Sequence, residues 1–422
     1  MFKIFLFCYF CKINNKIKKI MKAKKIILLI VLCFSQFFIQ CSTDENKGIE
    51  RKMTDRELAE IIQLTNYISG SLGTDSKNVV YDSERQTFII GKDILMSLEE
   101  AKDRYNHSDA NVTGKIDQMG AAYKMTPERA ASVKIFISAE VSPDWRIAIN
   151  KAIENWNTIN SGITITVSDA KTYPTIVISA FAANSSKAIA YAHLPYNGVP
   201  GTSLEINAYY NNLEASKKIF VITHELGHTF GLNHTNESEG SLIPCTPISD
   251  DGSIMFSLID QWTDFSAYDT IAISSLYPVA VGTKKLYRFK KNQYYYYTTD
   301  PCEIIPGKEG YVLDKDAGYL YEKQIEGTVP LYRTFNGAIV KDHSLSKNQT
   351  TADDIILGYL FSDKQPQTTA LYTTVSSYEY FPDNYAHYLY TTNFDKDVFI
   401  MSIIGYVPNK IILEDKQNSI VL

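Results

Sequence analysis

The residues best suited to chemistry lie in one short stretch, which holds three of the seven histidines in the chain. His224 and His228 are four residues apart, so on a helix both imidazoles project from one face and can bind one metal ion. Glu225 follows the first histidine, within reach of a water molecule on that metal. Gly231 permits a sharp turn that most side chains disfavour, and this turn brings His234 round as a third nitrogen ligand. Three neutral nitrogens leave the fourth position of a zinc ion open for water, which is typical of a catalytic site.

The chemistry that this pattern predicts is zinc-assisted hydrolysis. We expect His224, His228 and His234 to bind Zn²⁺ and Glu225 to act as the general base. The short pattern His-Glu-x-x-His also arises by accident on buried helices. A third histidine after a glycine, at the offset seen here, argues against an accident.

A methionine lies in a second informative stretch, Ser253–Met255, which follows His234. With this stretch and the histidine motif, residues 132–278 resemble the catalytic domain of metzincin metalloproteases, in particular the HEIGH-type peptidases of bacterial lipoproteins (peptidase family M57). The resemblance implies an α+β domain with a twisted mixed sheet and an active-site helix, a zinc cofactor, and protein or peptide substrates. It also implies that Met255 packs as a hydrophobic floor beneath the imidazoles without binding the metal.

The resemblance further implies where a substrate lies and how it is cut. Zinc would acidify a water molecule, and Glu225 would take its proton and return it to the leaving amine. Substrates of metzincins usually lie antiparallel along an exposed edge strand, which the resemblance places at Ala188–His193. His193 is a candidate for an extra ligand, although a lone histidine is more often a surface residue. The alternative function is a surface lipoprotein with an inactive protease domain whose C-terminal repeats capture a glycan or a host protein; the retained Glu225 favours the active enzyme.

Two departures from metzincin patterns bear on regulation. Phe256-Ser257 follow the methionine, so the tyrosine ligand of some members is missing. The chain has no cysteine between Cys41 and Cys245, which excludes latency through a cysteine in a pro-segment. Cys245 and Cys302 are the only cysteines after Cys41, and one disulfide between them is an option that the sequence cannot establish.

The elements that must position the motif are predicted by hydrophobic periodicity within a protease domain at residues 128–279. One long helix should carry the histidines, and a second should open at Pro143 with apolar residues at helical spacing. β-branched stretches predict the strands. The expected elements are strands Val133–Ser138, Gly162–Val167 and Thr175–Ala180 and helices Glu214–Leu232 and Phe265–Leu276.

The N-terminus resembles an export signal. Lysines 22, 24 and 25 precede an apolar run from Ile26 to Ile39, so residues 1–40 are interpreted as a leader. Within it, we expect Met21 to be the biological start of translation. Cys41 follows in a stretch similar to a bacterial lipobox, which implies a lipid anchor in the outer membrane, facing the periplasm or the cell exterior. A plain secretory signal is the alternative. Residues 41–127 are a tether followed by an accessory or pro-segment with a helix at Asp55–Leu64, a strand at Gln86–Ile90 and a helix at Ser97–Tyr105.

The C-terminal third, residues 284–422, is rich in tyrosine and contains a repeat. Leu-Tyr pairs begin at Leu286, Leu331 and Leu371, and Gly-Tyr pairs begin at Gly310, Gly358 and Gly405. Three copies of short strands predict an all-β three-fold domain, most simply a β-trefoil. It resembles the tyrosine-rich repeat domain of unknown function that is attached to many secreted bacterial proteins. Its tyrosines either pack between repeats or stack on a carbohydrate ligand.

The charge of the chain excludes one class of partner. The formal net charge is −5, but residues 1–40 carry eight lysines and no acidic residue, so the charge without them is −13. Binding of nucleic acid needs clustered Lys and Arg to neutralise phosphates. We therefore expect no nucleic-acid partner.

Overall fold

The structure, a computed structural model, describes residues 53–107, 124–169, 176–184, 188–236, 242–292, 294–335, 343–376, 387–393 and 401–410. The predicted leader, the lipobox cysteine Cys41 and the tether lie outside these residues. Within the described ranges, no helix combines the length and the apolar character needed to cross a membrane. The chain divides into two compact units, Met1–Glu60 and Ile61–Leu422, and the elements below belong to the second apart from the start of helix α2.

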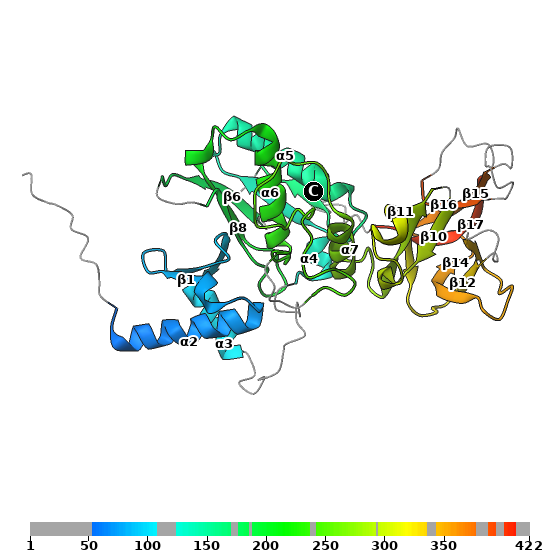
Figure 1. Ribbon diagram of the computed structural model, residues 1–422, viewed down its shortest axis with the longest axis horizontal. Coiled ribbons are helices and arrows are strands. Elements are labelled where there is room, and N and C mark those ends of the chain that lie inside the picture. The colour runs from blue at the N-terminus through cyan, green and yellow to red at the C-terminus, as the bar shows by residue number, and fades with distance from the viewer. Residues whose placement is uncertain are drawn as a thin grey trace, which may run out of the picture. The chain divides into compact units, whose positions relative to one another are not determined.

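An eight-stranded mixed sheet lies at the centre of the region that holds the histidine motif (Figure 1). Its strand order is β1-β2-β3-β7-β8-β6-β4-β5. Strands β4, β5, β6 and β8 are parallel, whereas β7 is antiparallel to β8. The strands are β1 (Val79–Asp82), β2 (Thr87–Ile90), β3 (Ile94–Ser97), β4 (Val133–Ile137), β5 (Ile165–Val167), β6 (Ile176–Phe181), β7 (Ala190–His193) and β8 (Ser203–Asn207). The α+β class and the mixed sheet agree with the expectation from sequence.

Helices accompany this sheet. The predicted helices are present, but α2 continues eight residues beyond its predicted end at Leu64. The α-helices are α2 (Asp55–Leu72), α3 (Leu98–His107), α4 (Pro127–Ala130), α5 (Pro143–Thr158), α6 (Ala215–Thr229) and α7 (Ala267–Leu276). Short 3₁₀ turns occur at η1 (Ser76–Asn78), η3 (Ala208–Tyr210), η4 (Pro301–Glu303) and η5 (Lys308–Gly310). Helix α6 ends three residues before the predicted Leu232.

Helix α6, which carries the histidine pair, is held by its neighbours. It contacts α5 and the strands β7 and β8, and its residues from Phe220 to Thr229 are all buried. On α5, Trp145, Ile149 and Trp156 recur at helical spacing and are buried. The indole Nε1–H of Trp156 donates a hydrogen bond of 3.0 Å to the carbonyl oxygen of Thr223, immediately before the first histidine of the motif. The helix is therefore fixed both by packing and by a buried hydrogen bond.

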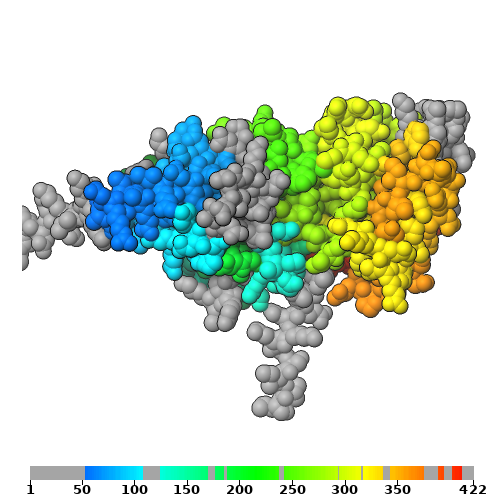
Figure 2. All heavy atoms as spheres, turned by 90° about the horizontal axis from the view of Figure 1, so that it is seen from below, coloured from blue at the N-terminus to red at the C-terminus, as the bar shows by residue number. Residues whose placement is uncertain are grey.

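The segment predicted as an accessory or pro-segment joins the same sheet. Strands β1, β2 and β3 form antiparallel pairs, and β3 then pairs in parallel with β7. A second apolar cluster lies under these strands, and it includes Ile68, Phe88, Met96 and also Leu194, which follows β7. In the space-filling view, this segment is found by its blue to cyan colour (Figure 2).

The C-terminal domain is a nine-stranded antiparallel sheet made of three similar units. In each unit the first strand is central and pairs with the two strands that follow it. The last strands of the units, β11, β14 and β17, contact one another. Leu286, Leu331 and Leu371, which begin the Leu-Tyr pairs, are all fully buried in one cluster. The strands are β9 (Thr283–Lys291), β10 (Tyr294–Thr298), β11 (Val312–Tyr321), β12 (Thr328–Phe335), β13 (His343–Ser346), β14 (Ile355–Phe361), β15 (Thr368–Ser376), β16 (His387–Thr391) and β17 (Met401–Pro408). The repeat is present among the described residues, but a β-trefoil is not confirmed.

Candidate metal centre

The three histidines predicted as metal ligands meet at one point. His224 and His228 lie one turn apart on α6, and His234 follows the turn at the end of the helix. The Nε2 atoms of His224 and His228 are 3.0 Å apart, and the Nε2 atom of His234 lies 3.2 Å from each of them. All three residues are buried, with at most 8% of their surface exposed.

Backbone carbonyls orient two of the rings. The Nδ1 atom of His224 lies 2.7 Å from the carbonyl oxygen of Ile254, and that of His228 lies 2.7 Å from the carbonyl oxygen of Leu232. Because a carbonyl oxygen only accepts hydrogen bonds, Nδ1 carries the proton in both rings and each Nε2 lone pair faces the shared point. Burial, followed by the neighbouring His224, lowers the pKa of His228 well below its usual value, so that this ring is neutral.

The spacing of the nitrogens fits zinc. Tetrahedral ligands at about 2.0–2.1 Å from a zinc ion lie roughly 3.3 Å from one another. The observed separations of 3.0–3.2 Å are close to this value. Hydrogen bonding does not account for the contact between the two helical histidines, because both carry their proton on Nδ1. The donor set is therefore suited to one zinc ion.

Two glycines let the chain form this arrangement. Gly231 has φ +94°, in the left-handed region that glycine alone adopts without strain, and it ends α6 and redirects the chain toward His234 as predicted. Gly227 lies on α6 between the two histidines. A Cβ atom on residue 227 would lie 2.3 Å from the Sδ atom of Met255, so only glycine lets the methionine pack this closely against the helix.

Glu225 is buried beside the histidines. Only 3% of its surface is exposed, and its Oε2 atom has no hydrogen-bond partner among the described residues. Burial, followed by the nearby charge of Asp93, raises the pKa of this carboxyl group well above its usual value. A carboxyl group in this environment binds a proton more readily than an exposed glutamate does, which suits a general base.

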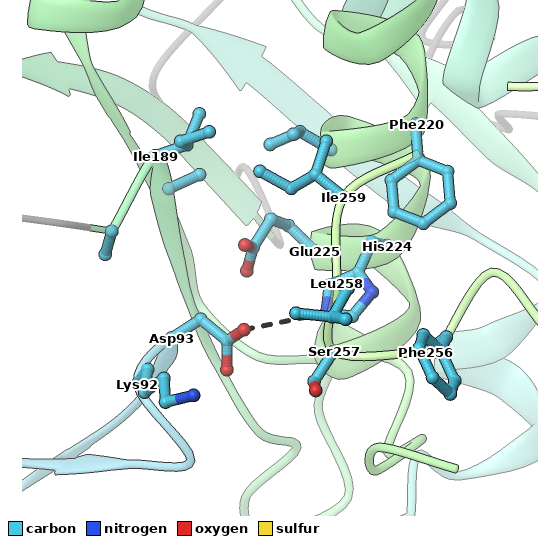
Figure 3. A pocket seen from close by; sticks show the side chains of 13 residues that line it. Lys92, Asp93, Ile189, Phe220, His224, Glu225, Phe256, Ser257, Leu258 and Ile259 are labelled. Atoms are coloured by element: carbon cyan, nitrogen blue, oxygen red, sulfur yellow. Dashed lines mark ion pairs between the residues drawn. The ribbon is translucent and has the colours of Figure 1, made fainter. Parts of the chain in front are cut away.

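A small pocket of about 120 Å³ opens beside Glu225 (Figure 3). The segment before β7 lines one side, and residues 256–259, which follow Met255, line the other. Its lining is mostly apolar and includes Ile189, Phe220, Leu258 and Ile259. Figure 3 shows the Glu225 carboxylate directed into the space between Ile189 and Asp93.

Asp93 is a residue of this site that the sequence did not reveal. Its Oδ2 atom lies 3.2 Å from Nε2 of His234 and 3.7 Å from Nε2 of His224. Its Oδ1 atom lies 3.8 Å from Nε2 of His228. Burial alone would raise the pKa of Asp93, but the imidazoles that face it outweigh burial and lower the pKa. A lone aspartate 141 positions before His234 carries no local signal, so only the folded chain identifies it.

The predicted substrate edge is present but is not exposed. Ala190–His193 form β7, and β3 pairs with its outer side, with Ile94 opposite Ala192 and Leu95 opposite His193. His193 does not join the metal-binding group; its Nδ1 atom lies 3.9 Å from Oε2 of Glu100. The expectation of a free edge is wrong for this structure because the N-terminal strands add to the sheet on that side.

Family comparisons divide the chain in two. Residues 88–254 match the family of dual-action HEIGH metallo-peptidases. Residues 260–363 match a family defined as a domain of unknown function, DUF5648. No curated protein matches the chain.

Two solved structures of myroilysin are also similar to this chain. Both share 15% identity with it and have a TM-score of 0.26. The first match covers 35% of this chain and 81% of the myroilysin chain, and the second covers 38% of this chain and 93% of the myroilysin chain. The family match includes Glu225 and all three histidines, whose geometry fits zinc. The segment of residues 88–254 is therefore a zinc metallopeptidase domain of the HEIGH type.

Proposed function

We propose that the protein is an exported zinc endopeptidase that cuts peptide bonds, with His224, His228 and His234 as the zinc ligands and Glu225 as the general base. The convergence of the three Nε2 atoms beside a buried carboxyl group is the observation that carries this proposal. When bound, zinc polarises a scissile carbonyl group and acidifies water.

The contribution of the chain itself is proton transfer and positioning. The unpaired Oε2 atom of Glu225 can accept a proton from an attacking water and deliver it to the leaving amine. The carbonyl groups of Ile254 and Leu232 hold the imidazoles in place during this exchange. The apolar pocket beside Glu225 favours a substrate with an apolar side chain next to the scissile bond.

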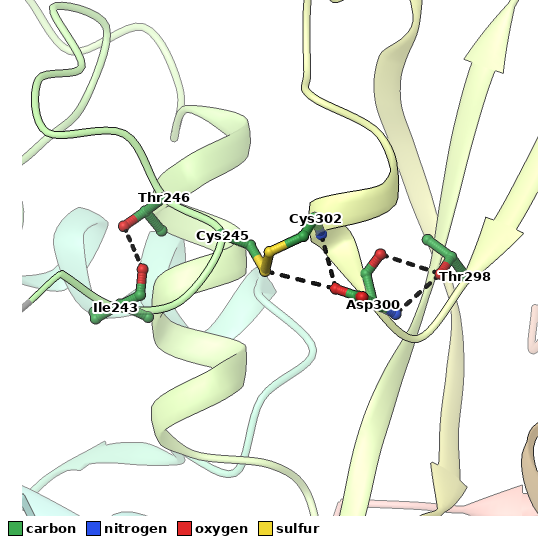
Figure 4. Close-up of a disulfide and its surroundings, with 6 residues drawn as sticks. All are labelled: Ile243, Cys245, Thr246, Thr298, Asp300 and Cys302. Carbon is green, nitrogen blue, oxygen red and sulfur yellow. Dashed lines mark hydrogen bonds between the residues drawn. A yellow bond between two sulfur atoms is a disulfide. The ribbon is translucent and has the colours of Figure 1, made fainter.

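Export is supported by a disulfide between Cys245 and Cys302 (Figure 4). It joins the loop after the zinc ligands to the turn after β10, and structural disulfides persist in oxidising compartments. The pairing is the one that the sequence left open. We propose a lipid anchor at Cys41 and an outer-membrane location, facing the periplasm or the exterior, from the lipobox resemblance alone.

A role for the C-terminal repeats in binding carbohydrate is a subordinate proposal. Tyr287, Tyr297, Tyr319 and Tyr390 are buried, so these rings serve packing. A sugar would stack on partly exposed rings, of which Tyr332 is an example.

Cleavage of an unbiased peptide library tests the proposed activity. We would compare the wild-type chain with Glu225→Gln, and with Glu154→Gln as a control because Glu154 is an exposed glutamate on α5. Zinc content is measured for each. All three are also prepared with Asp93→Ala, because Asp93 faces the histidines.

In at least one of the two backgrounds, zinc-dependent cuts should appear with the chain that keeps Glu225 and equally with Glu154→Gln. They should fall by about 10²–10⁴-fold with Glu225→Gln at equal zinc content. Cleavage that survives Glu225→Gln undiminished would contradict the role of this residue. Zinc binding without cleavage in either background would favour the surface-binding lipoprotein.

A further inference from the structure

The carboxylate of Asp93 occupies the side of the metal centre that a catalytic zinc site keeps open. The three Nε2 atoms and one Asp93 oxygen all lie within 4.8 Å of one another. The carboxylate is 18% exposed, and its Oδ1 atom is buried with no hydrogen-bond partner among the described residues. A carboxylate oxygen is a common zinc ligand, and three histidines plus one carboxylate complete a tetrahedral set.

Asp93 is delivered to this position by the tip of a hairpin. It lies between β2 and β3, where Ile90 pairs with Ile94. Gly91 and Lys92 both have positive φ, +58° and +89°. A lysine rarely adopts this conformation, and such strain persists only where surrounding contacts hold it in place.

The strand that follows Asp93 lies where a substrate should lie. The backbone N–H of Ala192 on β7 donates to the carbonyl oxygen of Asp93 at 2.9 Å, and β3 continues the pairing. These backbone groups of β7 are the ones that a substrate strand would need. Strand β3 is parallel to β7, whereas the metzincin resemblance implies an antiparallel substrate. The chain direction of β3 is therefore opposite to that expected for a bound substrate peptide.

The N-terminal segment is fastened by buried contacts. The guanidinium of Arg104 on α3 is nearly buried; it pairs with Glu100 at 2.7 Å and donates to the carbonyl oxygen of Pro195, beyond β7, at 2.7 Å. Arg85 pairs with Glu205 on β8 at 2.6 Å. The segment is thus held against the catalytic sheet by residues that do not belong to the metal-binding group.

We propose that Asp93 is a fourth protein ligand of the zinc ion and that β3 fills the substrate edge, so that this structure is the latent form of the peptidase. The latency part of this inference rests on the proposed peptidase function, whereas zinc binding by Asp93 does not depend on it. Asp93 takes the place of water, and β3 takes the place of the peptide. Activation requires both to leave, which withdraws the hairpin from β7.

The test uses the full chain loaded with cobalt(II), whose visible absorption reports its coordination. Asp93→Ala removes the ligand, and Asp93→Asn keeps the size of the side chain if the alanine variant fails to fold. Asp103→Ala is the matched control, because Asp103 is a partly exposed aspartate on α3 of the same segment. Each protein is titrated with acetohydroxamate, a small metal-binding probe, and is assayed with the peptide library.

The visible spectrum should change in Asp93→Ala and Asp93→Asn but not in Asp103→Ala. Acetohydroxamate should bind the Asp93 variants about tenfold more tightly or better, as expected if the closed site is populated above roughly 90%. Peptide cleavage should rise in both Asp93 variants and stay unchanged in Asp103→Ala. A spectrum and a probe affinity that are unchanged by Asp93→Asn would overturn the proposal.

The results separate the two proposals. Altered spectra and tighter probe binding with no cleavage in any variant would keep Asp93 as a ligand and reject the peptidase. Equal cleavage and equal spectra in every variant would keep the peptidase and reject latency through Asp93.

Discussion

Met255 packs directly against Gly227 on the helix that presents the metal ligands. A Cβ atom on residue 227 would lie 2.3 Å from the Sδ atom of the methionine and 3.4 Å from the ring of Trp156. Real Cβ contacts are never this short, so the helix and the methionine loop approach each other only because residue 227 has no side chain.

Gly227→Ala should therefore destabilise the protein although alanine is the better helix former. Overpacking of a filled core costs about 1–3 kcal/mol, which exceeds the gain of about 1 kcal/mol in helix propensity. Gly70→Ala on α2 is the control, because nothing lies within 4 Å of its Cβ position. Thermal unfolding of the zinc-loaded variants should show a lower midpoint for residue 227 and an equal or higher midpoint for residue 70. Midpoints that rise in both would contradict the packing argument.

Asp269 should position the zinc ligand His224 through Ile254. Its carboxylate accepts hydrogen bonds from the Ser253 hydroxyl at 2.5 Å and the Ile254 N–H at 2.9 Å, and the Ile254 carbonyl oxygen orients His224. Asp269→Ala should weaken zinc binding by roughly 10–100-fold, as loss of such outer partners does. Competition with a chelator measures the affinity. Asp264→Ala, at an exposed aspartate before the same helix, should leave it unchanged, and equal affinities in both variants would exclude the positioning role.

The disulfide should stabilise the chain mainly by closing a long loop. Cys245 and Cys302 are 57 residues apart, and closing a loop of this length is worth about 4 kcal/mol in the chain-entropy view. Cys245→Ser with Cys302→Ser should lower the urea midpoint of residues 42–422. Reductant should have the same effect on the wild-type chain and none on the double variant. A wild-type midpoint that ignores reductant would mean that the bond does not form.

His343 should make the protein less stable in acid. Burial, followed by the charge of Arg333, lowers the pKa of His343 to about 4. Between pH 6.5 and pH 4 the unfolded chain binds a proton that the folded chain does not, so the free energy of unfolding falls as pH falls. The loss is at most roughly 2–3 kcal/mol, because part of the ring is exposed to solvent.

Urea unfolding of wild type and His343→Phe at pH 7 and pH 4 measures this effect. Phenylalanine keeps a ring between Tyr296 and Phe335 and cannot titrate. The variant should lose less stability on acidification than the wild type. Parallel losses in the two proteins would assign the pH dependence to other groups.

The chemistry of the metal centre was predictable from sequence because its parts are local. His224, Glu225, His228 and His234 lie within eleven consecutive residues, and helix geometry and one glycine turn are enough to bring their side chains together. The repeat of the C-terminal domain was predictable for a similar reason, since Leu-Tyr pairs recur after 45 and then 40 residues. Its closure was not, because strand order depends on pairings between repeats, and the β-trefoil remains unconfirmed.

Only the tertiary structure decided what surrounds the zinc ligands. Asp93 has no motif of its own, and it reaches His234 because β2 and β3 extend the catalytic sheet past β7. The same pairing covers the edge that the resemblance left free for a substrate. The cysteine pair was equally undetermined until the fold placed residues 245 and 302 together. Contacts between distant segments arise from the burial of whole surfaces, and that burial is a property of the folded chain which no local pattern encodes.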